Sequence, residues 1–341
     1  MKKYLTFFVF IATTNIAFGQ QLSHYSQYMH NSLLLNPAIA GLEGNIEGQI
    51  SNRSQWVGFA GGPKTYYLSV HGEVSGMTPK SSCLMLTKPS MASSSRYYLS
   101  KIPNSLRQGI GGTIIADQYG LFSKTSGYAS YALHIPLNVK NERAKYNLSV
   151  GISVGMSNIK FNGGSSTIPN PEEETYIDFT TQKFYINYLD MNAGLWFYSE
   201  LYYIGYATNQ LLKDKVKFGD FPPGTGLLNV HHFITAGYQY RVNDDFTLVP
   251  SVMVKLVQPA PASYDFNAKL LYRQYIWGGI SYRHKDAVSG LLGITLNDKV
   301  YIGYSYDMTT SDLKSYNSGS HEVILGVKFA QSKRVKARAS F

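Results

Sequence analysis

The sequence predicts an all-β protein, a transmembrane antiparallel β-barrel of about 14 strands, with 12 as the alternative count. Three observations predict it. Charged residues make up only 15% of the 341 residues, against roughly 25% in an ordinary soluble domain. Tyr and Gly are abundant, at 28 and 31 residues. Many short segments alternate between apolar and polar residues, which together with the low charge is typical of a sheet with one face in lipid.

The clearest alternation runs through residues 146–157. One face carries Leu148, Val150, Ile152, Val154 and Met156, and the other carries Ser149, Gly151, Ser153, Gly155 and Ser157. The polar face of a soluble sheet would usually carry Lys, Glu and Thr. A face of only Gly and Ser predicts a barrel lumen that is crowded by a plug or by the opposite wall.

Thirteen segments show this period and are predicted as strands. They are 45–54, 64–74, 109–117, 126–136, 146–157, 184–198, 201–208, 230–240, 246–257, 269–283, 288–296, 299–307 and 321–329. Bacterial single-chain barrels have even strand numbers, so one further strand is expected, within 184–198 or within 76–107.

The connections between these strands predict how the barrel sits in the membrane. Long connections fall at 76–107, 158–183, 209–229, 258–268 and 308–320. Outer-membrane barrels have short periplasmic turns and long outer loops, and an even strand count places both termini in the periplasm.

Aromatic residues near strand ends are expected to form girdles at the two membrane interfaces. This set comprises Tyr66, Tyr67, Trp196, Phe197, Tyr198, Tyr202, Tyr203, Tyr301, Tyr304 and Tyr306. The alternative, that they are ordinary strand formers of a soluble sheet, leaves the low charge unexplained.

The chain divides into four predicted regions. They are a signal peptide at 1–19, an N-terminal segment in or under the barrel at 20–44, the barrel at 45–329 and a basic periplasmic tail at 330–341. The signal peptide has two lysines, then an apolar stretch, and small residues before a cut at Gln20. Export and a barrel together predict the outer membrane of a Gram-negative bacterium. The segment 20–44 does not alternate, and its run of three leucines would be unfavourable in an exposed arm.

No constellation of residues predicts catalysis, a cofactor or a metal. His231 and His232 are adjacent, so on a strand they point to opposite faces and cannot hold one ion together. The acidic run at 172–174 lacks the spacing of a calcium loop. Cys83 is the single Cys, and no segment marks one Ser as a nucleophile. We therefore expect no enzyme, no cofactor and no nucleic-acid partner, since the basic residues are scattered over strands.

Two dense motifs remain, at 36–41 and 53–65. The first, Asn-Pro-Ala-Ile-Ala-Gly, predicts a sharp turn into the first strand. The second joins the first two strands through a Gly/Pro connection that carries Arg53 and Trp56. It is either an ordinary turn with an interfacial Trp or a docking surface for a protein partner, since Trp and Arg are typical anchors of such surfaces.

These motifs resemble those of the PorP/SprF family of type IX secretion and gliding-motility outer-membrane proteins. The matching residues of the first part are Ser26, Gln27, Tyr28, Met29, Asn31, Asn36, Pro37, Ala38, Ala40 and Gly41. Those of the second part are Arg53, Gln55, Trp56, Gly58, Gly61, Pro63 and Thr65. From these motifs we take as candidate partner-binding residues Gln27, Tyr28, Asn36, Pro37, Gly41, Arg53, Gln55, Trp56, Gly58, Pro63 and Thr65.

The resemblance implies a 14-stranded barrel of the fatty-acid-transporter-like type, without enzymatic activity, that works with the type IX secretion machinery. It implies a role in exporting a large surface adhesin or anchoring it through its C-terminal signal domain. A channel for hydrophobic solutes is the alternative that this architecture permits, and a barrel-embedded hydrolase is a weaker one. The connection 76–107 and the tail beyond Phe329 depart from the family pattern.

Overall fold

The computed structural model describes residues 22–74, 106–140, 143–161, 185–212, 215–216, 226–273, 275–296 and 299–331. The predicted signal peptide, Cys83, the acidic run at 172–174 and the tail beyond residue 331 lie outside the described residues. No helix among the described residues is long and apolar enough to cross a membrane.

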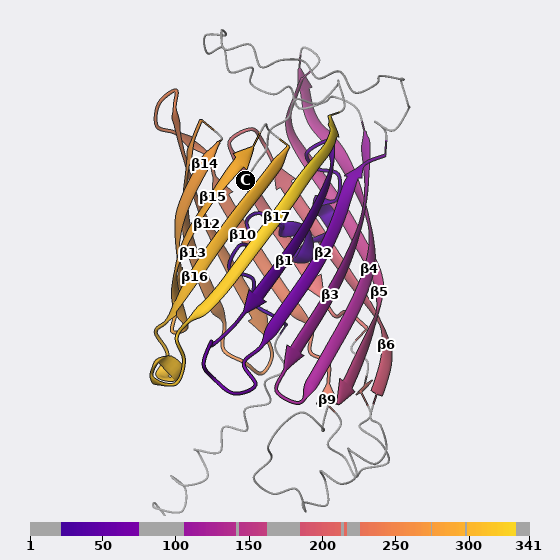
Figure 1. Cartoon of the computed structure of the whole chain (residues 1–341). Coiled ribbons are helices and arrows are strands. Elements are labelled where there is room, and N and C mark those ends of the chain that lie inside the picture. The colour runs from indigo at the N-terminus through magenta and orange to yellow at the C-terminus, as the bar shows by residue number, and fades with distance from the viewer. Residues whose placement is uncertain are drawn as a thin grey trace, which may run out of the picture.

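Antiparallel strands form one closed sheet (Figure 1). Its strands are β1 (Asn45–Ser54), β2 (Lys64–Glu73), β3 (Arg107–Tyr119), β4 (Phe122–Lys140), β5 (Arg143–Phe161), β6 (Tyr185–Tyr198), β7 (Tyr202–Asn209), β10 (His231–Tyr238), β11 (Tyr240–Arg241), β12 (Phe246–Val257), β13 (Ser263–Tyr272), β14 (Ile276–Arg283), β15 (Ala287–Leu296), β16 (Val300–Thr309) and β17 (Ser320–Gln331). Neighbours in the chain are neighbours in the sheet. β17 pairs with β1, and β10 pairs with both β7 and β12, which closes the barrel. Two short strands, β8 (Lys215–Val216) and β9 (Gly226–Leu227), pair with each other in a separate sheet that is not part of the wall.

The wall has 14 strands, as predicted, because β10 and β11 are one strand interrupted at Gln239 and both pair with β12. The predicted position of the missing strand was wrong. The segment 184–198 holds one strand, whereas the predicted strand 269–283 is two, β13 and β14. The chain reverses between Tyr272 and Ile276, which are paired in the sheet, and Arg273 has a φ of 45°. That turn, Arg-Gln-Tyr, carries no Gly, Pro, Asn or Asp, so the sequence does not mark it.

β5 has the two faces that its alternation predicts. Ile152, Val154 and Met156 are each about half exposed, at 50–53%, and face outward. Ser149, Ser153 and Ser157 are at most 3% exposed and face the lumen. The prediction of a crowded lumen is confirmed, because a Cβ added to Gly151 would lie 2.3 Å from the backbone nitrogen of Ala38.

The prediction that the aromatic residues near strand ends form interfacial girdles is correct for only some of these residues. Tyr66 and Tyr306 face outward, at 49% and 39% exposure. Tyr67, Trp196, Tyr198, Tyr203 and Tyr301 are instead buried in the lumen, at 5% exposure or less. Successive side chains on a strand point to opposite faces, so adjacent aromatic residues cannot all lie at the interface.

The barrel has two mouths of different character. One, called the loop mouth below, carries the connections 55–63, 120–121, 162–184, 210–230, 258–262, 284–286 and 310–319. It is the lower end in Figure 1, where the short helix η4 (Asp312–Ser315) lies. At the other, the C-terminal mouth, β1 begins and β17 ends, and every connection has four residues or fewer except the one between β2 and β3.

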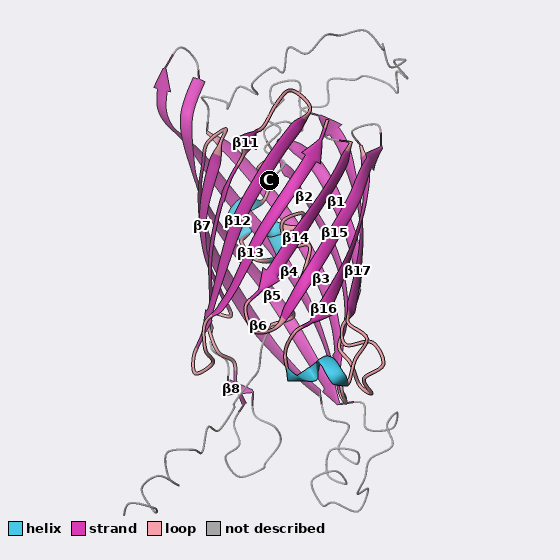
Figure 2. Ribbon diagram, turned by 90° about the vertical axis from the view of Figure 1, so that its left-hand side faces the viewer, coloured by secondary structure: helices cyan, strands magenta, loops and turns pink. Residues whose placement is uncertain are grey.

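Residues 22–44 lie inside the barrel and are called the plug below. The plug contains two short 3-10 helices, η1 (Ser32–Leu34) and η2 (Pro37–Ile39), which Figure 2 shows within the wall. Its first residue, Leu22, contacts His231 and Lys255 at the loop mouth. The expectation that both termini share one side is therefore wrong for the amino end of the described chain. An even strand count places the start of β1 and the end of β17 at the same mouth. It does not predict where a segment that precedes β1 runs.

Candidate functional site

The plug packs against almost the whole circumference of the wall. Its buried apolar side chains are Tyr25, Tyr28, Met29, Leu33, Leu35, Ala38, Ile39, Ala40 and Leu42. Tyr25, Tyr28, Met29 and Leu35 share one cluster with wall residues that include Phe233, Met253, Trp277 and Tyr301. Of the three leucines whose burial the sequence predicts, Leu33 and Leu35 are buried, at 5% and 7% exposure, and Leu34 is partly buried. Apolar packing therefore holds the plug in the lumen, and polar contacts fix its position against the wall.

Arg53 on β1 is the centre of an ion-pair cluster that holds the amino half of the plug. Its guanidinium lies 2.6 Å from the Asp307 carboxylate and 3.2 Å from that of Glu322. Ser26 of the plug completes the cluster: its backbone N–H donates to Glu322 at 2.8 Å and its hydroxyl donates to Asp307 at 2.6 Å. All four residues are 2% exposed or less. One arginine therefore balances two buried carboxylates that also bind the plug.

The neighbouring motif residues make single, specific contacts. The side-chain amide of Gln27 donates to the Glu322 carbonyl at 3.1 Å. The hydroxyl of Tyr28 accepts a 2.6 Å hydrogen bond from Asn267 on β13. Thr65 on β2 is paired in register with Arg53 and is 2% exposed. These three side chains face the lumen and are not available to a partner that stays outside it.

The Asn-Pro-Ala turn joins the plug to β6 and β7. The side-chain oxygen of Asn36 accepts from the Ala38 N–H at 2.9 Å and caps η2, whose first residue is Pro37. Its amide nitrogen donates to the carbonyls of Leu195 and Tyr206, at 3.0 and 3.3 Å. One side chain therefore both shapes the turn and anchors it to two strands.

Replacing Asn36 with Ala should loosen the plug without opening the wall. The variant loses a helix cap and leaves polar groups unpaired, which costs about 1–3 kcal/mol of plug stability. Hydrogen exchange of the backbone amides in 22–44 should rise by about tenfold or more, while exchange in β14–β16 stays unchanged. Equal exchange in the variant and the wild type would contradict this role.

The carboxyl end of the plug is fixed at the C-terminal mouth. Gly41 has a φ of +71°, and a Cβ there would lie 2.7 Å from the Cα of Gly109. Two wall side chains bind plug carbonyls, His134 at Ala40 (2.8 Å) and Arg107 at Leu42 (3.3 Å). The close contact of backbone with backbone explains why this part of the motif uses small residues.

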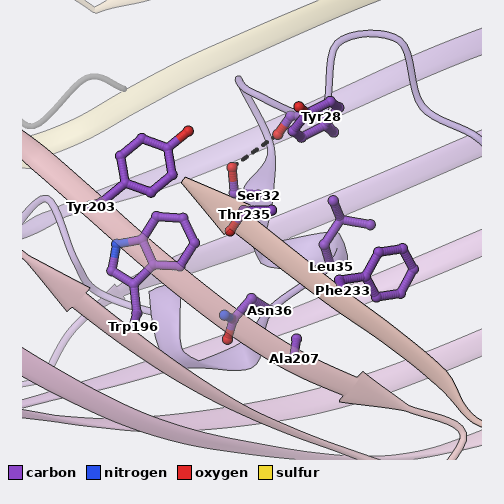
Figure 3. Close-up of a pocket in the computed structure, with 9 residues that line it drawn as sticks. All are labelled: Tyr28, Ser32, Leu35, Asn36, Trp196, Tyr203, Ala207, Phe233 and Thr235. Carbon is purple, nitrogen blue, oxygen red and sulfur yellow. Dashed lines mark hydrogen bonds between the residues drawn. The ribbon is translucent and has the colours of Figure 1, made fainter. Parts of the chain in front are cut away.

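Small cavities lie between the described parts of the plug and the wall, and two of them are lined by residues of both. One, of about 10 Å³, is lined by residues that include Asn36, Trp196 and Tyr203 (Figure 3). The indole and phenol rings of Trp196 and Tyr203 stack at 4.6 Å beside the plug. The other cavity, of about 50 Å³, is lined by Asp190 and Tyr128 among others. These volumes have room for one water molecule and for a few, respectively.

The connection 55–63 and the connection 310–319 form one surface at the loop mouth, called the loop platform below. Val57 pairs with the other connection through its backbone: its N–H donates to Gly319 at 2.8 Å, and its carbonyl accepts from Ser318 at 2.7 Å. The loop is closed at its base by a 2.8 Å bond from the Gln55 N–H to the Pro63 carbonyl. Gly58 has a φ of +90°, a conformation that suits glycine.

The loop platform exposes apolar side chains although its backbone is tied by these hydrogen bonds. Val57, Phe59 and Tyr316 are 39%, 45% and 69% exposed. Trp56 lies against Phe59, with ring centroids 6.4 Å apart, and has a φ of 50°, which is unusual for a residue other than glycine. Strain and exposed aromatic rings on an ordered loop are typical of a binding surface.

The structure thus separates the eleven candidate residues into two groups. Gln27, Tyr28, Asn36, Pro37, Gly41, Arg53 and Thr65 fix the plug in the lumen. Gln55, Trp56, Gly58 and Pro63 shape the loop platform. The expectation that Arg53 anchors a partner at the surface needs correction, because its side chain is 1% exposed and pairs with Asp307 and Glu322. The sequence analysis did not identify Asp307 and Glu322 of the cluster, or Phe59 and Tyr316 of the platform. Asp307 and Glu322 could have been found as acidic residues on strand faces that otherwise carry mainly small residues.

Within the described residues, no three His, Cys, Asp or Glu side chains come together in an arrangement that could hold a metal ion. His231 faces the lumen and His232 faces outward, where its ring accepts or donates a 2.9 Å bond with Tyr206. The predicted opposition of this pair is confirmed.

The sequence as a whole settles the family. The profile described as type IX secretion system membrane protein PorP/SprF matches residues 17–327. The chain belongs to the PorP/SprF family. It is an outer-membrane β-barrel of the type IX secretion system, a class of membrane protein and not of enzyme, and its partners belong to that secretion machinery. No curated protein is significantly similar to it.

Several solved membrane proteins are similar to the chain at low sequence identity. The chain is similar to the CymD monoaromatic hydrocarbon channel (10% identity, TM-score 0.48, covering 92% of this chain and 94% of that one). It is also similar to a TodX monoaromatic hydrocarbon channel mutant (9%, 0.44, 88% and 94%). A third similar structure is the outer membrane protein Omp33 of Acinetobacter baumannii (7%, 0.38, 84% and 100%).

Proposed function

We propose that this PorP/SprF-family barrel is a docking partner that exports a large surface adhesin, or anchors it, through the adhesin's C-terminal signal domain. The observation that carries the proposal is the loop platform, an ordered surface with exposed aromatic rings on a barrel whose lumen is filled. A protein that works by binding needs a rigid anchor in lipid and a preorganised surface, and it needs no open passage.

The loop platform has the properties of an interaction surface. Phe59 and Tyr316 come from two connections that are far apart in the sequence and are joined by backbone hydrogen bonds of 2.7 and 2.8 Å. The loops therefore lose little conformational freedom when a partner binds. Aromatic side chains of this kind provide most of the binding energy in many protein interfaces.

Transport of hydrophobic solutes has less support. A hydrophobic solute would need a continuous apolar path, but the plug covers the apolar cluster of the inner wall, and much of the remaining wall presents Ser, Asn and charged side chains. The cavities described above, of about 10 and 50 Å³, are too small for such a solute. The plug would have to leave the lumen first, which would break the Ser26 and Asn36 contacts.

The double variant Phe59→Ser/Tyr316→Ser should weaken the complex and leave the barrel folded. Loss of two aromatic anchors is expected to lower the amount of adhesin that copurifies by at least about tenfold. The matched control is Tyr240→Ser/Val242→Ser, which removes two residues of similar exposure, 54% and 52%, at the C-terminal mouth. Copurification at the wild-type level by the platform variant would contradict the assignment of the surface.

The function itself is tested by removing the gene. We expect one large secreted protein to disappear from the cell surface, and plasmid-borne wild-type protein to restore it. If surface display is unchanged and the uptake of a fatty acid is lost, the barrel is a transporter and the proposal is wrong.

A further inference from the structure

The plug runs through the barrel from one mouth to the other. At its amino end, the Leu22 N–H donates to the Nε2 atom of His231 at 3.3 Å, and the Leu22 carbonyl accepts from Lys255 at 3.3 Å. His231 is the first residue of β10 and Lys255 is close to the end of β12. Both positions lie at the loop mouth. The ring of His231 also donates from Nδ1 to the Asn229 carbonyl, at 2.8 Å, which leaves Nε2 free to accept.

The contacts then move steadily along the barrel axis. Ser26 meets Asp307 and Glu322, each two residues from the loop-mouth end of its strand. Asn31 donates to Ser69 in the middle of β2, at 2.8 Å. Glu43 pairs with Lys328 at 2.7 Å, near the end of β17 at the C-terminal mouth. The direction in which the plug runs is therefore defined by contacts with five strands and not by a single contact.

The connections indicate which mouth faces the cell exterior. Four of the seven connections at the loop mouth, 55–63, 162–184, 210–230 and 310–319, have nine residues or more. Five of the six at the C-terminal mouth have four residues or fewer. Outer-membrane barrels carry their long loops outside and their short turns in the periplasm.

We propose that the amino end of the plug is presented on the outside of the cell, beside the loop platform, while its carboxyl end and the end of β17 face the periplasm. A partner that approaches the loop mouth then meets Leu22 and Ser23 together with the platform. The adhesin proposed above then contacts both the platform and the plug's own amino end, an extension that rests on the proposed function. The placement of the amino end itself is independent of the proposed function, because it rests on the contacts of the plug with the wall.

Site-directed labelling on intact cells tests the placement. In a Cys83→Ser background, Ser23→Cys is exposed to a membrane-impermeant maleimide. Ser315→Cys, on the exposed helix η4, marks the loop mouth, and Asp244→Cys, in an exposed turn, marks the C-terminal mouth. We expect Ser23→Cys and Ser315→Cys to be labelled on intact cells, and Asp244→Cys only after the outer membrane is permeabilised.

A second variant covers poor reactivity of a half-buried thiol. A short epitope inserted before Leu22 should bind its antibody on intact cells, whereas the same epitope inserted at Asp244 should bind only after permeabilisation. The proposal is overturned if position 23 or the first epitope becomes accessible only together with position 244. It is also overturned if Ser315→Cys is labelled only after permeabilisation, because the orientation is then reversed.

Discussion

Replacement of Arg53 with Met should destabilise the barrel far more than the loss of an exposed charge on its wall. The variant removes the ion-pair partner of both Asp307 and Glu322, which are 2% and 0% exposed. Removing one partner from a buried ion pair costs about 3–5 kcal/mol. We expect a matching fall in the free energy of unfolding in urea, followed by the gel shift between the folded and the unfolded barrel, and looser binding of the plug through Ser26.

Arg273 provides the matched control. It forms an ion pair with Asp245 at 2.7 Å, but the two side chains are 54% and 40% exposed. Such surface pairs contribute about 0–1 kcal/mol, so Arg273→Met should change the stability little. The triple variant Arg53→Met/Asp307→Asn/Glu322→Gln removes the uncompensated charges and should recover part of the loss. An equally small effect of Arg53→Met and Arg273→Met would show that the cluster does not hold the wall and plug together.

The double variant Gly109→Val/Gly151→Val should expel the plug and open the barrel. A Cβ at Gly109 would lie 1.8 Å from the Ala40 carbonyl oxygen, and one at Gly151 would lie 2.3 Å from the Ala38 nitrogen. Both overlaps are with plug backbone, which cannot rotate away, and each costs at least about 1–3 kcal/mol. The expected result is a stable conductance in planar lipid bilayers and entry of large antibiotics into cells that carry the variant.

Gly290→Val is the control for this experiment. It places the same side chain on β15, where a Cβ meets nothing within 4 Å. It should leave both conductance and antibiotic entry at the wild-type level. If the double variant stays closed and the plug remains protected from protease, the plug does not depend on close contact with the wall.

Much of the fold could be predicted because each strand carries its own evidence. Alternation on β5 identified lipid-facing and lumen-facing residues, and the low charge identified a membrane wall. The division of 269–283 could not be predicted, since the turn at Arg273 is held by a bond to Asp245 in the neighbouring turn and not by turn-forming residues. Long-range contacts of this kind leave no local signal.

The site was predicted in its residues but not in their roles. Arg53 and Trp56 are three positions apart in one motif, yet Arg53 is buried and Trp56 lies half-buried in the loop platform, because the chain passes from strand to loop between them. The path of the plug could not be predicted either. It depends on the contacts of Leu22, Ser26 and Glu43 with strands more than 200 residues away.

The central claim is that this barrel is closed by its plug and acts by binding. The most direct test is the conductance of the purified wild-type protein in planar lipid bilayers, measured beside Gly109→Val/Gly151→Val. The structure predicts no stable open state for the wild type and a stable open state for the variant. A steady wild-type conductance equal to that of the variant would contradict the claim.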